Sequence, residues 1–426
     1  MQRRDFLRAA GAAAGAAVLP GCATMGGGSA GKVVVVGGGY AGATCAKYLR
    51  MWSNGAVDVT LIEPREAFVS CPISNLVIGG SKTIADVTVP YDNLSRRWGV
   101  NVVRDTATGI DVDKRVVTTA GGRNLPYDRL VLAPGIEFMW DAIASYKADP
   151  VRATGIVPHA WQAGEQTVLL RRQLESMPDG GVYALSIPVA PYRCPPGPYE
   201  RACQVAWYFK RAKPKSKVLV LDGNPDVTSK AGLFKKAWND LYKGIVEYRP
   251  NHVLTDVDLA TKTAKFETAD DVRASVLNVI PPHRAGGIAR TAGVITANNR
   301  WCEVDFLSYE SIRGKGVHVL GDSIQIAPGM PKSGHMANNQ AKVAAAAILR
   351  QLGGQSPIAT PMLTNTCYSF ITDKDVVHVA SVHQYDVAKK TMLAVPGSGG
   401  LSPAMNELEG RFALSWAQNI WADTLG

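Results

Sequence analysis

The order of apolar and polar residues near position 32 predicts a buried strand that leads directly into a helix. Residues 33–36 are four consecutive valines, and a short apolar run of this kind is typical of a strand covered on both faces. The run meets Gly37-x-Gly39-x-x-Gly42, and residues 43–52 then favour a helix. In such a turn the three glycines permit a tight bend, close approach of a pyrophosphate and close helix packing. The pattern therefore predicts a dinucleotide-binding turn.

A second apolar run supports this interpretation. Residues 57–62 predict a strand, and the strand ends at Glu63, 21 positions past Gly42. Dinucleotide-binding folds place a carboxylate on the ribose hydroxyls about 20 residues after the glycine turn. We therefore expect Gly37, Gly39, Gly42 and Glu63 to bind the dinucleotide.

Later apolar runs predict a second unit and a return to the first. Residues 217–222 predict another buried strand, but the turn after it, residues 223–226, has one glycine, and Asp222 and Asp226 flank it. Carboxylates there would repel a pyrophosphate, so we expect no usable NAD(P)H site. Residues 316–320 predict a strand followed by Gly321 and Asp322, and an alanine-rich helix begins near His335.

This last segment favours a flavin over a nicotinamide. In two-dinucleotide-domain flavoproteins an aspartate at the place of Asp322 binds the ribityl chain, and the following helix points its N-terminus at the flavin. That helix end stabilises negative charge on a reduced flavin. We therefore expect FAD, with Gly321, Asp322 and His335 at its site, although His335 is equally suited to capping the helix.

Taken together, the runs predict an α/β fold. It has two Rossmann-like dinucleotide-binding domains and a small α+β C-terminal domain, an organisation that resembles glutathione-reductase-like flavoproteins. The predicted boundaries are a signal at 1–30, a discontinuous FAD-binding domain at 31–145 and 280–352, a second Rossmann-like domain at 146–279, and a C-terminal interface domain at 353–426.

The amino terminus predicts export to the periplasm. Arg3-Arg4-Asp5-Phe6-Leu7 is a twin-arginine pattern, and an alanine-rich stretch follows it. Residues 19–22 partly resemble a lipoprotein processing site, so Cys22 is a candidate lipid anchor, although the proline there favours simple cleavage. No later segment has the uninterrupted apolar length of a transmembrane helix.

Charge and composition limit the classes of partner that the chain is expected to bind. The 426 residues carry a formal net charge of +10, which suits an acidic protein partner, an anionic substrate or a membrane face. The chain has no zinc-finger or RNP-type signature and no strong basic run, so we expect neither a nucleic-acid partner nor a metal site.

Three of the seven cysteines stand in informative surroundings. Cys194 lies in a loop stiffened by three prolines, and Arg193 and Arg201 are close enough in sequence to lower a thiol pKa. Cys71 and Cys367 lie in the segments Ser-Cys-Pro-Ile-Ser-Asn and Thr-Asn-Thr-Cys-Tyr-Ser. The others are expected to be core or structural residues: Cys45, Cys203 and Cys302.

The Cys-Pro-Pro-Gly-Pro-Tyr-Glu-Arg loop, the Thr-Cys-Tyr-Ser segment and the order of elements resemble the flavoprotein subunit of flavocytochrome c sulfide dehydrogenase. That resemblance implies a periplasmic enzyme that oxidises sulfide and passes electrons through FAD to a c-type cytochrome subunit. It implies a thioether from Cys71 to the flavin, a redox-active disulfide between Cys194 and Cys367, and an acid at Glu200. Because CxxCH is absent, any haem belongs to a partner chain.

Other interpretations remain open at this stage. Cys194 and Cys367 could form a plain structural disulfide or stay unpaired in the core, and Cys71 could be a small apolar core residue. A sulfide:quinone reductase uses the same fold and similar cysteines, and a non-catalytic flavin-binding partner protein is a further alternative.

Overall fold

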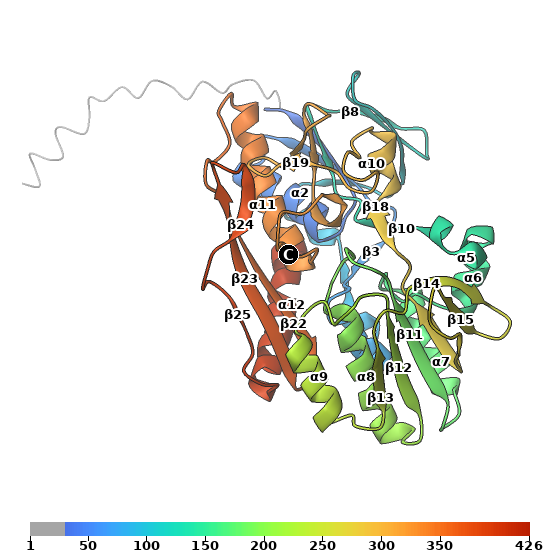
Figure 1. Cartoon of the computed structure of the whole chain (residues 1–426). Coiled ribbons are helices and arrows are strands. Elements are labelled where there is room, and N and C mark those ends of the chain that lie inside the picture. Colours follow the sequence, from blue (N-terminus) through green and yellow to red (C-terminus); the bar gives the residue numbers. More distant parts are fainter. Residues whose placement is uncertain (1–29) are drawn as a thin grey trace, which may run out of the picture.

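The structure, a computed structural model, describes residues 30–426. The predicted twin-arginine signal and the candidate lipid anchor at Cys22 fall in residues 1–29, outside the described part of the chain. Figure 1 shows the chain entering the upper half first, passing through the lower half in green, and ending in the red segment along one side.

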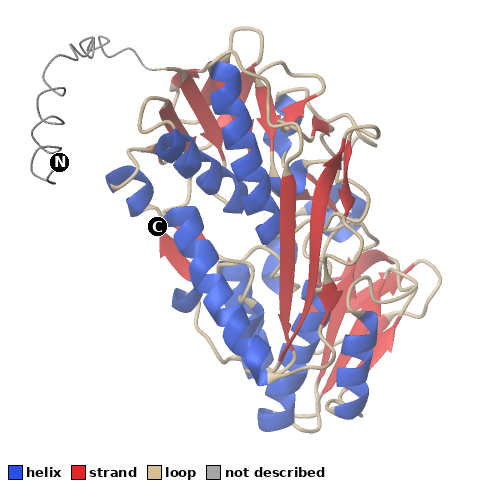
Figure 2. Cartoon of the chain, turned by 90° about the vertical axis from the view of Figure 1, so that its left-hand side faces the viewer, coloured by secondary structure: helices blue, strands red, loops and turns tan. Residues whose placement is uncertain are grey.

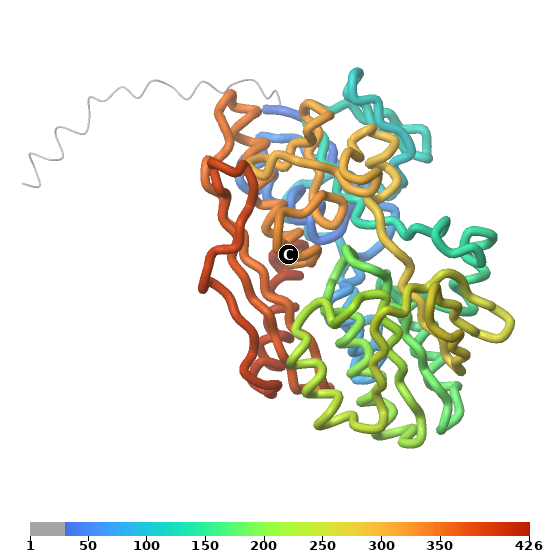
Figure 3. The backbone as a smooth tube through the Cα atoms, viewed as in Figure 1, coloured from blue at the N-terminus to red at the C-terminus, as the bar shows by residue number. Residues whose placement is uncertain are grey.

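A seven-stranded sheet forms the centre of the upper half. Its order is β19-β20-β21-β9-β1-β2-β5, and all neighbouring strands from β21 to β5 are parallel. The strands are β1 (Lys32–Val36), β2 (Asp58–Ile62), β5 (Asn101–Val103), β9 (Arg129–Leu132), β19 (Val304–Asp305), β20 (Glu310–Ser311) and β21 (Val317–Val319). Valines 33–36 are buried, as their apolar run predicts. The sheet thus joins strands from both ends of the chain, and Figure 3 shows blue and orange tubes interleaved there.

Two long helices pack against each other beside this sheet. Helix α2 (Tyr40–Trp52) follows the glycine turn, and α11 (Gly334–Leu352) follows the loop after β21 and η3 (Gly321–Ser323). Smaller elements of this half are β3 (Ala67–Val69), η1 (Ala85–Val87), β4 (Thr88–Pro90), α4 (Asp92–Arg96), β6 (Ala107–Asp111), β7 (Val116–Thr119), β8 (Asn124–Pro126) and α10 (Gly287–Thr291). Helix α3 (Asn75–Gly79) follows β3 in the chain but packs against α7 (Glu165–Ser176) and α8 (Gly197–Ala212) of the lower half.

A four-stranded parallel sheet forms the lower half, in the order β13-β12-β11-β17. Its elements are β11 (Val182–Ile187), β12 (Lys217–Asp222), β13 (Val246–Arg249), β17 (Val276–Val279), α7 (Glu165–Ser176), α8 (Gly197–Ala212) and α9 (Ala231–Asp240). Beside it lie η2 (Trp140–Ala142), α5 (Ala144–Ala148), α6 (Pro150–Ile156), β14 (Leu254–Asp258), β15 (Thr263–Phe266) and β16 (Val272–Arg273). The antiparallel pair β10 (Ile136–Phe138) and β18 (His283–Ala285) joins the two halves. The predicted α/β class is confirmed.

The strand order corrects one detail of the sequence interpretation. The strand at 217–222 is the second of its unit, not the first, because β11 precedes it and α8 crosses between them. The turn that would bind a pyrophosphate is therefore the β11–α8 loop, which carries Cys194. Asp222 takes the place of the ribose-binding acid, yet Tyr199, Tyr248 and Asn224 all donate to its carboxylate. Repulsion by the carboxylates near Gly223 is therefore the wrong reason to expect no NAD(P)H site, because the turn after β12 is not the turn that would bind a pyrophosphate.

The C-terminal segment forms a long antiparallel sheet and a helix. These are β22 (Met362–Phe370), β23 (Val376–Asp386), β24 (Thr391–Ala394), β25 (Gly400–Leu401) and α12 (Glu407–Leu425). Strand β22 packs against α11 of the upper half and α8 of the lower half. Figure 2, which views this side, shows the long strands running past both halves.

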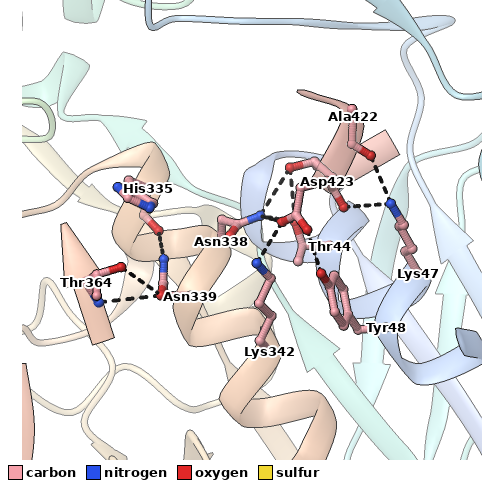
Figure 4. A network of polar contacts seen from close by, with 11 residues as sticks. Thr44, Lys47, Tyr48, His335, Asn338, Asn339, Lys342, Thr364, Ala422 and Asp423 are labelled. Carbon is pink, nitrogen blue, oxygen red and sulfur yellow. Dashed lines mark hydrogen bonds and ion pairs between the residues drawn. The ribbon is translucent and has the colours of Figure 1, made fainter. Parts of the chain in front are cut away.

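A polar network fastens the end of α12 to the upper half (Figure 4). Asp423 accepts hydrogen bonds from Tyr48 and Asn338 and pairs with Lys342 at 2.8 Å. Lys47 donates to the carbonyls of Ala422 and Asp423, both at 2.9 Å, at the end of the helix where few carbonyls have a helical partner. The helix is thereby held against α2 and α11.

None of the helices in residues 30–426 has the length and apolar character needed to span a membrane.

Candidate active site

A cavity of about 590 Å³ lies where the three parts of the fold meet. Its walls include the glycine turn at one end and, further along, residues from each of the segments that the sequence singles out. All predicted chemical residues line it: Cys71, Cys194, Glu200, Asp322, His335 and Cys367. Residues up to 300 positions apart in the chain are thus brought to one site.

The glycine turn has the geometry that its pattern predicts. At Gly37, where φ is +99°, a Cβ would lie 2.4 Å from the carbonyl oxygen of Ala133. At Gly42 a Cβ would lie 1.8 Å from the oxygen of Gly37, whereas at Gly39 it would meet nothing within 4 Å. The first and third glycines are therefore fixed by packing, and the second leaves open space for a phosphate.

Glu63 lies beside this turn, at the end of β2. Its Oε2 accepts from the backbone N–H of Gly38 at 2.7 Å, and its Oε1 accepts from Arg65 Nε at 2.8 Å. Burial alone would raise the pKa of Glu63, but the hydrogen bonds and charge of Arg65 outweigh burial and lower it. The carboxylate is therefore ionised and oriented toward the turn.

Asp322 and His335 also line this cavity. Asp322 Oδ1 is buried and has no hydrogen-bond partner among residues 30–426. His335 Nδ1 accepts from the N–H of Thr366 at 3.0 Å, and its ring meets Trp416 edge-on at 5.7 Å. The Ser333 side chain, not His335, caps α11 by accepting from Met336 N at 3.1 Å. The capping role considered for His335 is therefore wrong.

Cys71 lies beside an arginine that is distant in sequence. Arg193 Nη2 donates to Cys71 Sγ at 3.0 Å. Burial opposes ionisation of this thiol, but the charge and hydrogen bond of Arg193 outweigh it, so the pKa of Cys71 is lowered. Among the cysteines that line the cavity, Cys71 is therefore the one favoured as a thiolate.

Cys194 and Cys367 face the same cavity from the β11–α8 loop and from β22. Both thiols are unpaired, as is every cysteine among residues 30–426. Burial, then the charges of Cys367 and Glu200, raise the pKa of Cys194, although Arg193 opposes the shift. Arg193 thus acts on the pKa of Cys194 in the predicted direction, but burial and negative charge outweigh it, and Arg201 is bound elsewhere. Cys194 also has a left-handed backbone, with φ +54°.

Glu200 on α8 links β22, which carries Cys367, to α3, which begins four residues after Cys71. Its Oε1 accepts from the N–H of Phe370 on β22, and its Oε2 accepts from Asn75 on α3, both at 2.8 Å. Burial raises the pKa of Glu200 above the ordinary value, although these hydrogen bonds oppose the shift. A carboxyl group with a raised pKa in a cavity of thiols is suited to proton transfer.

Family models match three parts of the chain. A model described as sulfide dehydrogenase [flavocytochrome c] flavoprotein chain, central, matches residues 167–281, and one described as flavocytochrome c sulphide dehydrogenase, flavin-binding, matches residues 359–425. A pyridine nucleotide-disulphide oxidoreductase model matches residues 31–144. A stretch of 46 residues, 11% of this chain, is 59% identical to the sulfide dehydrogenase [flavocytochrome c] flavoprotein chain of Chlorobaculum thiosulfatiphilum and covers 94% of that sequence.

The chain belongs to the family of flavocytochrome c sulfide dehydrogenase flavoprotein chains. The resemblance carried by the Cys194 and Cys367 segments is thereby confirmed.

More distant relatives agree with the fold of this family. The chain is 25% identical over 301 residues to the mitochondrial sulfide:quinone oxidoreductase of Dictyostelium discoideum, which is 68% of this chain and 65% of that relative's length. The crystal structure of the sulfide:quinone oxidoreductase from Aquifex aeolicus matches with a TM-score of 0.75, at 19% identity, over 92% of this chain and 91% of that one. This likeness shows a shared fold.

The cavity fits FAD, the cofactor that the flavin-binding family model and the fold imply. The space above Gly39 accommodates a pyrophosphate, and Glu63 lies where a ribose would bind. The unpartnered Asp322 Oδ1 needs a hydroxyl donor, which a ribityl chain supplies. The residues that line the cavity therefore fit the FAD that the flavin-binding family model implies.

Two site residues have no clear signal in the sequence. Asn75 donates to Glu200 and to the carbonyl of Gly197, and it accepts from Arg201. Lys230 Nζ donates to the carbonyl of Cys367 at 2.8 Å and to Ser369 Oγ at 2.7 Å, and burial lowers its pKa to about 8. The only sequence clue to this role of Asn75 is its position four residues after Cys71.

Within residues 30–426, no cluster of three or more His, Cys, Asp or Glu residues could hold a metal.

Proposed function

We propose that this chain is a FAD-dependent sulfide dehydrogenase that passes electrons to a c-type cytochrome subunit. The observation that carries the proposal is that Cys71, Cys194, Cys367 and Glu200 line one cavity with a dinucleotide turn. A flavin bound along this cavity would extend from the glycine turn toward the thiols. The name of the closely matching Chlorobaculum sequence, which specifies flavocytochrome c, supports the choice of acceptor.

The proposed reaction begins at a disulfide between Cys194 and Cys367. Hydrosulfide attacks one of the two sulfurs, so a new S–S bond forms there while the old one breaks and the other cysteine leaves as a thiolate. Glu200 accepts the proton that the attacking sulfur brings. A second hydrosulfide removes the terminal sulfur as a disulfane, and loss of two electrons from the remaining thiols restores the disulfide. Bound FAD supplies the two-electron acceptor for this step and releases the electrons singly.

Covalent attachment of FAD through Cys71 is part of the proposal. The low pKa of this thiol supports it, because the thiolate is the nucleophilic form of cysteine. If the linkage forms, the yellow colour stays with the polypeptide after denaturation, and Cys71→Ser releases it. Complete release of FAD from the wild-type chain would contradict this element alone.

The partner and the compartment are proposed from the sequence. The twin-arginine pattern supports export to the periplasm, where a separate haem-bearing chain would take the electrons. Co-purification of a c-type cytochrome with the exported chain is the expected result.

A quinone acceptor is the alternative that the relatives favour, since two are named sulfide:quinone oxidoreductases. The deciding experiment compares acceptors with the same purified holoprotein. We expect sulfide, but not NADH, to bleach the flavin, and a c-type cytochrome to reoxidise it faster than a short-chain quinone. Full sulfide turnover by Cys194→Ser would falsify the disulfide mechanism.

A further inference from the structure

The contact between Arg193 and Cys71 joins two segments that lie 122 positions apart in the sequence. Cys71 follows β3 in the upper half, and Arg193 lies in the β11–α8 loop of the lower half. Arg193 Nη2 donates both to Cys71 Sγ, at 3.0 Å, and to the carbonyl of Trp161. The carbonyl holds the guanidinium in place, so the positive charge is fixed beside the sulfur.

The other cations near Cys71 are already engaged. Arg65 pairs with Glu63, and Arg201 is bound by Asn75 and Asn278. The pKa of Cys71 is lowered by the charges of Arg193 and Arg65 and by the backbone N–H of Ala163. An ionised Cys71 in turn raises the pKa values of Tyr40, Cys194 and Arg201. Arg193 alone combines a charge with a direct hydrogen bond from its side chain to the sulfur.

We propose that Arg193 activates Cys71 for covalent attachment of the flavin, by holding its sulfur as a thiolate that faces the cavity. This inference rests on the proposed thioether between Cys71 and FAD. It assigns to Arg193 a role in maturing the holoprotein, separate from the proposed turnover of sulfide at Cys194 and Cys367.

The attachment step balances with dioxygen as the oxidant. The Cys71 thiolate forms a bond to the 8α carbon of the flavin, and that carbon loses one hydrogen as a proton. The electron pair left over is held by the flavin ring until dioxygen accepts it with two protons as hydrogen peroxide. Arg193 contributes by making the thiolate available at neutral pH, where an ordinary thiol with a pKa of about 8.5 is mostly protonated.

The first test measures the covalent product and not sulfide oxidation. The full chain and its Arg193→Met, Arg193→Lys and Cys71→Ser variants are produced without flavin, in riboflavin-starved cells, and then mixed with FAD in air. Mass spectrometry of the denatured polypeptide follows the added flavin with time. We expect Arg193→Met to slow attachment severalfold, because a one-unit rise in thiol pKa lowers the thiolate fraction by up to about tenfold. Arg193→Lys should recover part of the rate, because it keeps the charge.

The second test measures the thiol itself. The flavin-free chains are treated with iodoacetamide across a range of pH, and alkylation is read on the peptide that contains Cys71. The midpoint should lie below that of an ordinary thiol in the wild-type chain and rise by about one unit in Arg193→Met. Arg172→Met is the matched control, since Arg172 is an exposed arginine on α7 away from the cavity, and its profile should equal that of the wild type.

The outcomes separate this inference from the function on which it rests. If Arg193→Met attaches flavin at the wild-type rate, or leaves the Cys71 midpoint unchanged, Arg193 has no activating role. If the wild-type chain carries no covalent flavin, the proposed thioether is wrong. A low alkylation midpoint of Cys71 that depends on Arg193 would then show that Arg193 ionises this thiol but does not serve flavin attachment. Binding of FAD without linkage by Arg193→Met excludes misfolding as the cause of a slow rate.

Discussion

At the scale of single residues, three cysteines in one cavity differ because each meets different charges. Arg193 lowers the pKa of Cys71, whereas burial and nearby negative charge raise the pKa of Cys194. Cys367 has a raised pKa from burial, opposed by Lys230. The sequence singles out these cysteines, but the pKa values of Cys71 and Cys367 depend on Arg193 and Lys230, which lie more than 100 positions away from them along the chain.

Glu200→Gln tests the proposed proton acceptor. Glu200 accepts a proton only when ionised, and its pKa is raised by burial, so activity should rise with pH through that raised value. In Glu200→Gln this acidic limb should vanish and the rate of flavin reduction by sulfide should fall about 100-fold. Stopped-flow reduction across pH measures both effects. An unchanged limb in the variant would assign it to ionisation of sulfide itself.

Lys230→Met tests whether a buried lysine stabilises the thiolate of Cys367. Lys230 has a pKa of about 8, so its charge is present below that pH and fades above it. In the reduced protein we expect alkylation of Cys367 at pH 7 to slow by roughly threefold to tenfold in Lys230→Met. The difference should shrink above pH 8, where the wild-type lysine is itself neutral. Lys230→Arg serves as control, because it keeps its charge across this range, and a uniform loss at every pH would instead indicate a packing defect.

At the scale of elements, the β11–α8 loop is the main departure from an ordinary dinucleotide-binding unit. A parallel strand, a loop and a helix are present, but the loop carries Cys194 and prolines where glycines would bind phosphate. Asp222, at the end of β12, is covered by tyrosine hydroxyls. The same supersecondary unit is thus suited to presenting a thiol.

Helix α12 is a second element whose placement affects the site, because it carries Trp416 into the cavity wall. Asp423→Asn removes the ion pair with Lys342 while keeping one acceptor oxygen. The ion pair is partly exposed, so the expected loss of unfolding free energy is about 1 kcal/mol. Thermal unfolding and hydrogen exchange over residues 407–425 measure it. Glu407→Gln, at an exposed pair with Lys374, should change neither quantity.

The same carboxylate predicts a pH dependence. Burial would raise the pKa of Asp423, but its ion pair and hydrogen bonds outweigh burial and lower it. Its contribution is therefore full above the unfolded pKa of about 3.9 and is lost as pH falls through the lower folded value. In acid, wild type and Asp423→Asn should converge in stability, and a constant difference would show that charge is not involved.

At the scale of the whole molecule, the net charge of +10 favours association with an acidic protein. If the proposed cytochrome partner is acidic, the bimolecular rate of its reduction should fall about tenfold or more between low and physiological salt. Stopped-flow mixing of the reduced holoprotein with the cytochrome measures this. A salt-independent rate would indicate docking through apolar contacts.

The sequence by itself determined the fold class, the glycine turn with Glu63, the family and which three cysteines line the cavity. These follow from local patterns, since a turn that must approach phosphate and a stiff cysteine loop leave marks within a few residues. Tertiary structure alone decided that Arg193 faces Cys71, that Asn75 and Lys230 join the site, and that burial raises the pKa of the Cys194 thiol. Each of these depends on burial and on charges from distant segments, which no short stretch of sequence encodes.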